Sequence, residues 1–163
     1  MFKIRLLILL LINILLVSCI SSKKENIINF SVAYIGGEYD GLILSNQLKQ
    51  YLNNFGMLND SSKLQIQASV SHKDNLFITN IDNTSDRERI ESKINLNVYD
   101  KELECFTYFY TNSLSQFYVL AASDKFISNK SAVEAIKIEN IEYLIKVFLN
   151  NIDDSVLDCN EEE

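Results

Sequence analysis

The stretch Lys63-Leu-Gln-Ile-Gln-Ala-Ser-Val-Ser71 alternates apolar and polar side chains more cleanly than any other part of the chain. Its even positions are apolar, and glutamine or serine stands at the odd positions between them. Because successive side chains of a strand point to opposite faces, this pattern predicts a β-strand with one buried and one solvated face. The next four residues, His72-Lys73-Asp74-Asn75, predict a turn, and residues 76–81 form a second, weaker apolar run.

The sequence before this strand predicts a strand followed by a helix. Residues 27–35 are rich in β-branched and aromatic side chains and are followed by Gly36-Gly37. Asp40 can cap a helix over residues 42–55, and Gly56 is well placed to end it. The apolar residues of this helix recur at the spacing of one buried stripe, namely Leu44, Leu48, Tyr51, Leu52 and Phe55.

The sequence after the opening strand predicts two more strands. Residues 82–85 are typical of a turn, residues 87–99 alternate again, and Asp100-Lys101 reverses the chain into a partner strand over residues 103–111. This last strand is aromatic on both faces, with Phe106, Tyr108 and Tyr110 on one side and Phe109 on the other. Either both faces are covered by the fold, or one of them meets a partner.

The C-terminal third predicts a long helix. Ser113-Leu-Ser-Gln116 matches a capping box, and residues 117–150 follow as a helix that is weakened at Ser128-Asn129. The resulting order is β-α-β-β-β-α. It predicts an α+β two-layer sandwich, with two helices packed on one face of a mostly antiparallel four-stranded sheet. The other face, rich in Gln, Asn and Ser, would be solvated or bind something.

The N-terminus predicts export and lipidation. Lys3 and Arg5 precede the apolar run of residues 6–17, which is shorter than the ~20 residues of a membrane-spanning helix. The run ends in Leu16-Val-Ser-Cys19, which resembles the lipobox of bacterial lipoproteins, where the cysteine receives a diacylglycerol and becomes the first residue. The alternatives are an unprocessed N-terminal helix or an ordinary signal with a chance cysteine.

The lipobox divides the chain into four parts. We expect a signal peptide over residues 1–18, a lipidated tether over 19–26, a folded domain over 27–152 and an acidic tail over 153–163. Acyl chains on Cys19 would hold the domain at a membrane. Position 20 is Ile and not the Asp that retains many lipoproteins in the inner membrane, which favours the periplasmic side of the outer membrane.

Charge and cysteine content narrow the range of partners. The formal net charge is −7, and loss of Lys3 and Arg5 with the signal makes it −9, which argues against nonspecific nucleic-acid binding. A polyanionic ligand would need a local basic patch. Cys105 and Cys159 remain after lipidation; an exported domain permits a disulfide between them, and the sequence does not show whether they meet.

No catalytic or metal-binding pattern emerges from the sequence. His72 is the single histidine and has no nucleophile in a recognisable setting, and Gly36-Gly37 matches no phosphate-binding loop. The acidic tail lacks the spacing of a calcium loop, two cysteines without histidines make no zinc site, and Glu102 and Glu104 flank a turn. We therefore expect a protein that is not an enzyme and uses no cofactor or metal.

The basic residues suggest one candidate binding site. If the fold gathered Arg87, Arg89, Lys125 and Lys130, they could hold phosphate groups, the arginines as forks and the lysines as point charges. The alternative is ordinary surface charge paired with neighbouring carboxylates, Asp86, Glu88 and Asp124.

The order of these elements resembles one family. The lipobox is followed by a strand, the helix segment from Gly41 to Gly56, the strand over 64–70, the segment Thr84-Ser-Asp-Arg87, and Ser115-Gln-Phe-Tyr-Val-Leu-Ala-Ala122 before a long helix. This order resembles the LptE family of lipopolysaccharide-assembly lipoproteins, most closely its alphaproteobacterial branch.

The resemblance implies a partner and a role. Members of the LptE family sit inside LptD, a large outer-membrane β-barrel, as a plug and assembly aid, and the pair inserts lipopolysaccharide into the outer leaflet. They are not enzymes, and their lipopolysaccharide contacts involve basic residues near the sheet edge and the last helix. Two alternatives remain: another non-catalytic envelope lipoprotein, such as a barrel-assembly accessory or envelope-maintenance module, and a periplasmic hydrolase.

Overall fold

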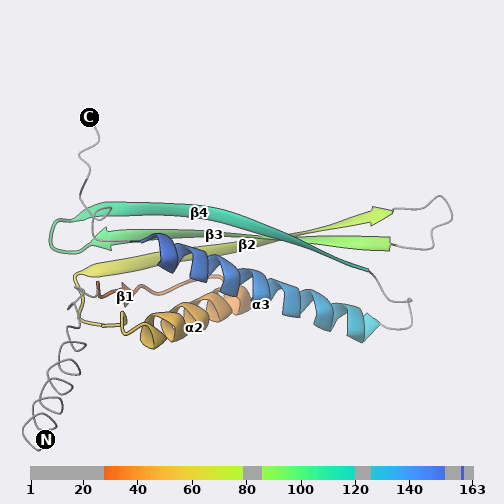
Figure 1. Ribbon diagram of the computed structural model, residues 1–163, viewed down its shortest axis with the longest axis horizontal. Helices are drawn as coiled ribbons and strands as arrows, with labels where there is room; N and C mark the ends of the chain where they lie inside the picture. Colours follow the sequence, from red (N-terminus) through yellow and green to blue (C-terminus); the bar gives the residue numbers. More distant parts are fainter. Residues whose placement is uncertain (1–27, 79–85, 120–125, 153–158, 160–163) are drawn as a thin grey trace, which may run out of the picture.

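The computed structural model describes residues 28–78, 86–119, 126–152 and Cys159, which fold into two layers (Figure 1). Within these residues, a four-stranded sheet forms one layer, and two helices lie side by side on one of its faces. This arrangement confirms the predicted β-α-β-β-β-α order and α+β class. In chain order the elements are β1 (Ser31–Val32), α2 (Glu38–Asn54), β2 (Leu64–Ile78), β3 (Asp86–Asp100), β4 (Cys105–Val119) and α3 (Phe126–Asn151).

The strands follow one another across the sheet in chain order. β1 pairs with β2 in parallel, because α2 lies between them and returns the chain to the same end of the sheet. β2 pairs with β3, and β3 with β4, in antiparallel register. The β2–β3 ladder runs from Leu64 opposite Asp100 to Ile78 opposite Asp86, so the sheet extends well beyond α2 (Figure 1).

Helix α2 buries Leu44, Leu48 and Leu52 of the predicted stripe, whereas Phe55, at the C-cap, is exposed, and the helix begins differently from the prediction. It starts at Glu38 behind Gly37, whose φ of 111° places it in the left-handed region, so Asp40 lies in the first turn and is not the cap. The predicted end is confirmed. The N–H of Gly56 donates to Asn53 O at 3.0 Å and that of Met57 to Leu52 O at 2.8 Å, the pattern of a Schellman motif.

A glycine contact sets how closely the chain before α2 approaches the helix. A Cβ added to Gly41 would lie 2.4 Å from the carbonyl oxygen of Gly36, a main-chain atom that cannot move aside easily. Any larger residue at position 41 would therefore push residues 33–37 away from α2. The strand predicted over residues 27–35 is correspondingly short, because the chain leaves the sheet after Val32 to make this approach.

The predicted turn at residues 72–75 is wrong. β2 continues through it to Ile78, since each of these residues has a partner on β3, from His72 opposite Ser92 to Asn75 opposite Arg89. Polar residues at these positions favour a turn locally, but the antiparallel ladder supplies backbone hydrogen bonds that a turn would lose. The predicted turn at Asp100-Lys101 is confirmed: the buried Asp100 carboxylate accepts the backbone N–H groups of Glu102 and Leu103 at 2.8 and 3.1 Å.

The predicted start of the last helix is also wrong. Ser113-Leu-Ser-Gln116 is not a capping box, because β4 runs through it to Val119 and pairs with β3 from Cys105 onwards. Within the described residues the helix begins at Phe126 and continues without interruption past Ser128-Asn129. The motif has the capping-box residues, but Leu114 between Ser113 and Ser115 also fits the alternation of a strand, and pairing with β3 decides between the two.

The hydrophobic core lies between α2, α3 and the first half of the sheet. Leu44, Leu48 and Leu52 of α2 are fully buried, as the spacing predicted. Phe148 of α3 is also fully buried, with ring centroids 6.1 Å from Tyr108 and 5.4 Å from Tyr110 of β4. Tyr108 and Tyr110 are therefore covered by α3. Phe106, which was predicted to share their side, is instead exposed on the side of Phe109, because the register between β3 and β4 shifts at Val98 and Tyr99.

Cys105 and Cys159 form a disulfide, with Cα atoms 6.1 Å apart. The sequence left this pairing open, and the structure decides it. The bond joins the start of β4 to a point beyond α3, so it ties the tail to the turn end of the sheet. The predicted signal peptide and the tether with Cys19 lie outside the described residues. So does the predicted tail, except for Cys159.

Candidate functional site

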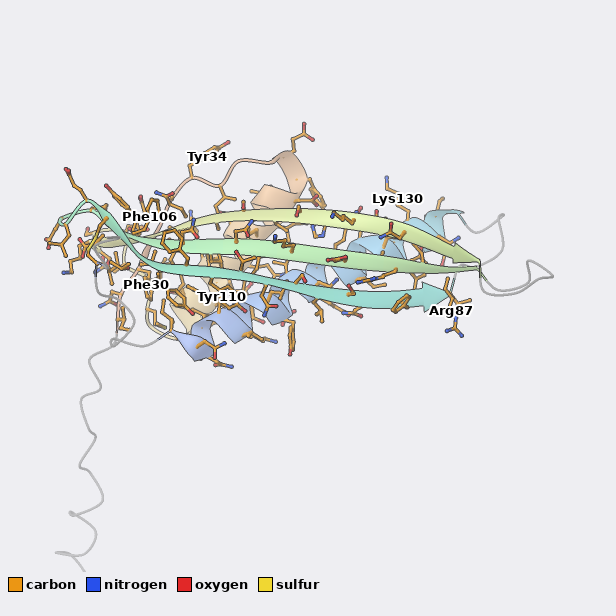
Figure 2. The ribbon with its side chains drawn as sticks, turned by 90° about the horizontal axis from the view of Figure 1, so that it is seen from above. Phe30, Tyr34, Arg87, Phe106, Tyr110 and Lys130 are labelled. Carbon is orange, nitrogen blue, oxygen red and sulfur yellow. A yellow bond between two sulfur atoms is a disulfide. The ribbon has the colours of Figure 1, made fainter. Side chains whose placement is uncertain are left out.

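The face of the sheet that carries no helix is polar (Figure 2). Because side chains alternate along each strand, this face receives the odd-numbered residues of β2 from Gln65 to Asn75, those of β3, and those of β4 from Phe109 onwards. Neighbouring strands are linked across it: Asn95 Nδ2 donates to Ser69 Oγ at 3.2 Å, and Thr111 Oγ1 donates to Asn95 Oδ1 at 2.8 Å. We call this surface the open face. Its uncharged polar residues include Gln65, Gln67, Ser69, Ser71, Asn75, Asn95, Asn97, Thr111, Ser113 and Ser115.

Four cations lie between the middle of the open face and one of its ends. Lys73 of β2 and Arg87, Arg89 and Lys93 of β3 all occupy outward positions, and Glu91 is the one carboxylate among the described outward residues around them. We call these four residues the basic patch. It is the local positive surface that a polyanion would need on a chain of net charge −7.

Arg89 is held in place within the basic patch. Its Nε and Nη2 atoms donate to Ser115 Oγ at 3.2 and 2.9 Å, and Nη2 lies 3.5 Å from the Glu91 carboxylate. Arg87 is exposed and lies opposite Val119, while Arg89 lies opposite Phe117. Both Phe117 and Val119 are about 60% exposed, so cationic and apolar groups stand side by side at this end of the open face.

The structure separates the four basic residues suggested by the sequence. Arg87 and Arg89 lie together on the open face, whereas Lys130 belongs to α3 on the helix side of the sheet (Figure 2). Lys125 lies outside the described residues. Sequence reasoning missed Lys73 and Lys93. The signal was present in the alternation of β2, but assigning residues 72–75 to a turn removed Lys73 from the strand.

Lys130 lines a separate hollow of about 350 Å³ between α3 and the far end of the sheet. Two of its carboxylates already have partners: Lys137 Nζ lies 3.3 Å from the Asp74 carboxylate, and Tyr118 Oη donates to Glu88 at 2.6 Å. Burial and the bond to Glu88 raise the pKa of Tyr118 well above its ordinary value, so it stays a neutral donor. These pairings favour a structural role for the hollow.

Three aromatic side chains lie together at the opposite end of the open face. The ring of Phe106 lies 5.2 Å from that of Tyr99 and 5.4 Å from that of Phe109, measured between centroids. We call these three residues the aromatic cluster. Phe109 is 64% exposed, so the outward aromatic side of β4 remains available to a partner. The open face thus has an aromatic end, an uncharged polar middle and a basic end.

His72 lies in a buried polar layer between the sheet and the helices. Its Nδ1 is 2.8 Å from Ser92 Oγ, which also accepts Asn140 Nδ2 at 3.0 Å, and Gln116 Nε2 donates to Asn140 Oδ1 at 2.8 Å. We call these four residues the polar layer. Burial lowers the pKa of His72, and the nearby Asp40 carboxylate, 3.9 Å from Nε2, partly opposes that shift.

Ser92, His72 and Asp40 have the residue types of a hydrolase triad, but the geometry does not suit one. Ser92 is fully buried beneath the helices, and its oxygen already accepts a hydrogen bond from Asn140, so a substrate carbonyl cannot approach it. Glu102, the other acid considered from the sequence, is exposed and 3.8 Å from Lys63, and Glu104 is exposed beside it. Neither glutamate lies in the dry cleft that acid–base chemistry favours.

The described residues contain neither a metal-binding cluster nor a membrane-spanning helix. Within residues 28–78, 86–119 and 126–152 and at Cys159, no cluster of three or more His, Cys, Asp or Glu side chains could hold a metal ion. No helix in the same part of the chain has the length and the apolar character needed to cross a membrane.

Comparison with known proteins shows the fold. No family model matches the chain, and no curated protein matches it. Among solved structures, a minor lipoprotein from Acinetobacter baumannii aligns with a TM-score of 0.58 at 16% identity, over 77% of this chain and 92% of that one. A candidate lipoprotein from Caulobacter crescentus aligns with a TM-score of 0.54 at 15% identity, over 74% and 86%. Rare lipoprotein B from Shewanella oneidensis aligns with a TM-score of 0.52 at 10% identity, over 76% and 93%.

Proposed function

We propose that this protein is a non-catalytic lipoprotein on the periplasmic side of the outer membrane, where it plugs an LptD-like β-barrel and assists lipopolysaccharide assembly. The observation that carries the proposal is its fold, which it shares with solved bacterial lipoproteins including rare lipoprotein B. The lipobox ending at Cys19 agrees with that fold, because it would attach the domain to a membrane by acyl chains.

The chemistry of the open face supports a plug inside a barrel. The lumen of an outer-membrane barrel is polar and hydrated, so a plug must present polar groups rather than an apolar surface to its wall. The middle of the open face has uncharged amides and hydroxyls, which exchange hydrogen bonds with water or with a polar wall at little cost. The exposed aromatic cluster adds a site where a partner could bury apolar area.

The basic patch supports contact with lipopolysaccharide. Lipopolysaccharide combines phosphate groups with acyl chains, and Arg87 and Arg89 stand beside the exposed Phe117 and Val119. Arginine binds phosphate through paired N–H donors, while the neighbouring side chains can contact apolar groups. We therefore assign the contact to Lys73, Arg87, Arg89 and Lys93. Lys130 lies on the helix side of the sheet and does not belong to this group.

The test is to identify the partner in the membrane. The full-length chain with a C-terminal tag would be crosslinked in cells, purified from outer membranes and analysed by mass spectrometry. We expect a large β-barrel to copurify, and depletion of the protein to lower surface lipopolysaccharide. Recovery of a barrel-assembly complex or of peptidoglycan, with surface lipopolysaccharide unchanged, would instead favour another envelope lipoprotein function.

A control separates the lipid from the folded domain. Cys19→Ala combined with a cleavable signal would release the protein into the periplasm. If the domain supplies the affinity, this variant still binds the barrel after release. Loss of binding by a correctly folded variant would show that the lipid anchor contributes most of the association.

A further inference from the structure

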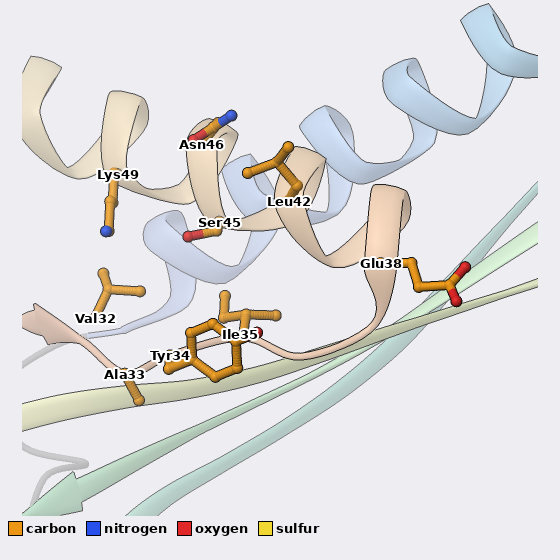
Figure 3. A pocket seen from close by; sticks show the side chains of 9 residues that line it. All are labelled: Val32, Ala33, Tyr34, Ile35, Glu38, Leu42, Ser45, Asn46 and Lys49. Atoms are coloured by element: carbon orange, nitrogen blue, oxygen red, sulfur yellow. The ribbon is translucent and has the colours of Figure 1, made fainter.

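A groove of about 630 Å³ runs between α2 and the chain from Val32 to Ile35 (Figure 3). One wall is the extended main chain just after β1. The other wall is a single face of α2, whose residues recur at helical spacing. The helix residues that line the groove are Glu38, Leu42, Ser45, Asn46 and Lys49.

The main chain at Val32 and in the two residues after β1 faces this groove with open hydrogen-bonding positions. Ala33 N–H donates to Ile66 O of β2 at 2.9 Å. This bond continues the pairing one residue past the end of β1. Because alternate residues of an extended chain direct their main-chain groups to opposite sides, those of Val32 and Tyr34, on either side of Ala33, point away from β2 and toward the groove. Among the described residues, neither makes a backbone hydrogen bond to a segment on that side.

Residues 57–59 occupy the same side of the chain beside Phe30, two residues before Val32. Phe30 N–H donates to Met57 O at 2.7 Å, and Phe30 O accepts the N–H of Asn59 at 2.8 Å, so the two segments form a short parallel bridge. The chain then turns away, with Ser62 N–H donating to Asn59 O at 2.9 Å. Among the described residues, no segment therefore continues the line of residues 57–59 past Val32 and Tyr34.

The side chains around the groove define its chemistry. Tyr34 is 96% exposed and Leu42 is 56% exposed, so both present apolar area to solvent. Figure 3 shows Lys49 beside Val32 at one end and Glu38 at the opposite end. Within the described part of the chain, neither Lys49 nor Glu38 lies in an ion pair with another residue. The groove thus has a cationic end and an anionic end.

We propose that this groove binds an extended peptide segment of a partner protein by β-strand addition to the edge at Val32 and Tyr34. The peptide main chain pairs with these two residues, its side chains contact Tyr34 and Leu42, and an acidic residue lies at the Lys49 end. A strand wedged between a sheet edge and a helix is one of the recurring modes of peptide recognition, because main-chain bonds supply affinity and the helix face supplies selectivity. At about 3.3 Å per residue, the four residues from Val32 to Ile35 match a peptide of about four residues.

The experiment uses the purified full-length chain in detergent and an array of immobilised hexapeptides of random sequence. Tyr34→Pro removes the N–H that faces the groove, and proline is tolerated at a strand edge. Tyr34→Ala is its matched control, because it removes the exposed ring but keeps the N–H. We expect a set of bound peptides enriched in Asp or Glu at one end, and about tenfold weaker binding for Tyr34→Pro than for Tyr34→Ala, the effect of one or two hydrogen bonds.

Lys49→Glu provides a second, independent readout at an exposed position. It should reverse the preference for an acidic residue among the bound peptides without changing the thermal melting of the protein. Equal binding by the proline and alanine variants, with Lys49→Glu leaving the peptide set unchanged, would overturn the proposal. So would the absence of any peptide bound above the level of a detergent-only control.

Discussion

The two halves of the sheet meet at the polar layer and differ in how much of the sheet the helices cover. In the half that contains the β3–β4 turn, α2 and α3 both cover the sheet, the core is apolar and the disulfide closes the end. In the other half only the first part of α3 accompanies the strands (Figure 1), and the described contacts there include the Lys137–Asp74 ion pair and the Tyr118–Glu88 hydrogen bond. We call these the closed half and the extended half.

The closed half supplies most of the stability, whereas the extended half carries most of the surface charge discussed above. Burial of large apolar side chains supplies most of the free energy of folding, and here it is concentrated in the closed half. The extended half receives its geometry from the long β2–β3–β4 ladder, which carries outward side chains far from the core. A basic patch can form there because a few cations on an exposed sheet face cost little stability.

The largest effect should come from the centre of the closed half. Phe148→Ala removes a fully buried ring that contacts Tyr108 and Tyr110, and leaves a cavity. We expect the free energy of unfolding to fall by about 3–5 kcal/mol, measured by urea denaturation. Asn150→Ala, at an exposed position of the same helix, is the control and should change it by less than about 0.5 kcal/mol. A small effect of Phe148→Ala would mean that the core lies elsewhere.

The disulfide should give the next largest effect. Cys105 and Cys159 close a loop with a sequence separation of 54 residues, so the bond restricts the unfolded chain. Replacing both cysteines with serine should lower the free energy of unfolding by about 2–4 kcal/mol. Wild-type protein measured with and without reductant should show the same difference. If reduction left stability unchanged while the thiols were confirmed free, the disulfide would not stabilise the closed half.

A smaller effect should appear at the boundary between the halves. The pKa of His72 is lowered below its ordinary value of 6.5 mainly by burial; Asp40, Asp74 and Glu134 oppose the shift, while Lys137 adds to it. The unfolded chain therefore binds the proton more readily, and the stability contributed by neutral His72 is complete above about pH 6.5 and decreases as the pH falls toward the lowered value.

His72→Gln tests this effect because glutamine keeps a hydrogen-bonding group for Ser92 but does not titrate. Between about pH 6.5 and 5, the free energy of unfolding of the variant should decrease less steeply than that of the wild type. Identical slopes in this range would show that His72 titrates alike in the folded and unfolded chains.

The smallest effect on stability should come from the basic patch. Arg87→Gln combined with Arg89→Gln changes exposed or half-exposed side chains of the extended half, so the free energy of unfolding should move by less than about 0.5 kcal/mol beyond the loss of the Arg89–Ser115 bonds. Binding of purified lipopolysaccharide should nevertheless weaken and lose part of its salt dependence, measured by surface plasmon resonance. Lys130→Gln is the control and should bind as the wild type does.

The sequence predicted the closed half better than the extended half. The leucine stripe of α2 and the glycine that ends this helix follow from the local sequence, and both were confirmed. Errors occurred where polar residues at 72–75 and 113–116 matched turn and cap patterns. In both places long-range pairing with β3 overrode local preference, and a single sequence does not contain that pairing explicitly.

The residues of the candidate site were likewise predicted in part from local alternation and in part only from long-range pairing. Arg87 and Arg89 were suggested because they lie close together in the sequence, and strand alternation alone places them on one face. Alternation along the same strand also places Lys93 on that face. Lys73 joined them only through the register between β2 and β3, which sets Lys73 opposite Glu91. The separation of Lys130 from this group also required the structure, since the sequence does not state which face of the sheet a helix covers.

The sequence by itself determined the class of fold, the lipobox and the acidic balance, because composition and local periodicity carry that information. Only the tertiary structure decided the Cys105–Cys159 bond, the length of the sheet, the membership of the basic patch and the groove beside β1. Each of these depends on which residues meet across a ladder or between layers. Such contacts are set by the packing of the whole chain against the entropy of its unfolded state, and not by any one segment.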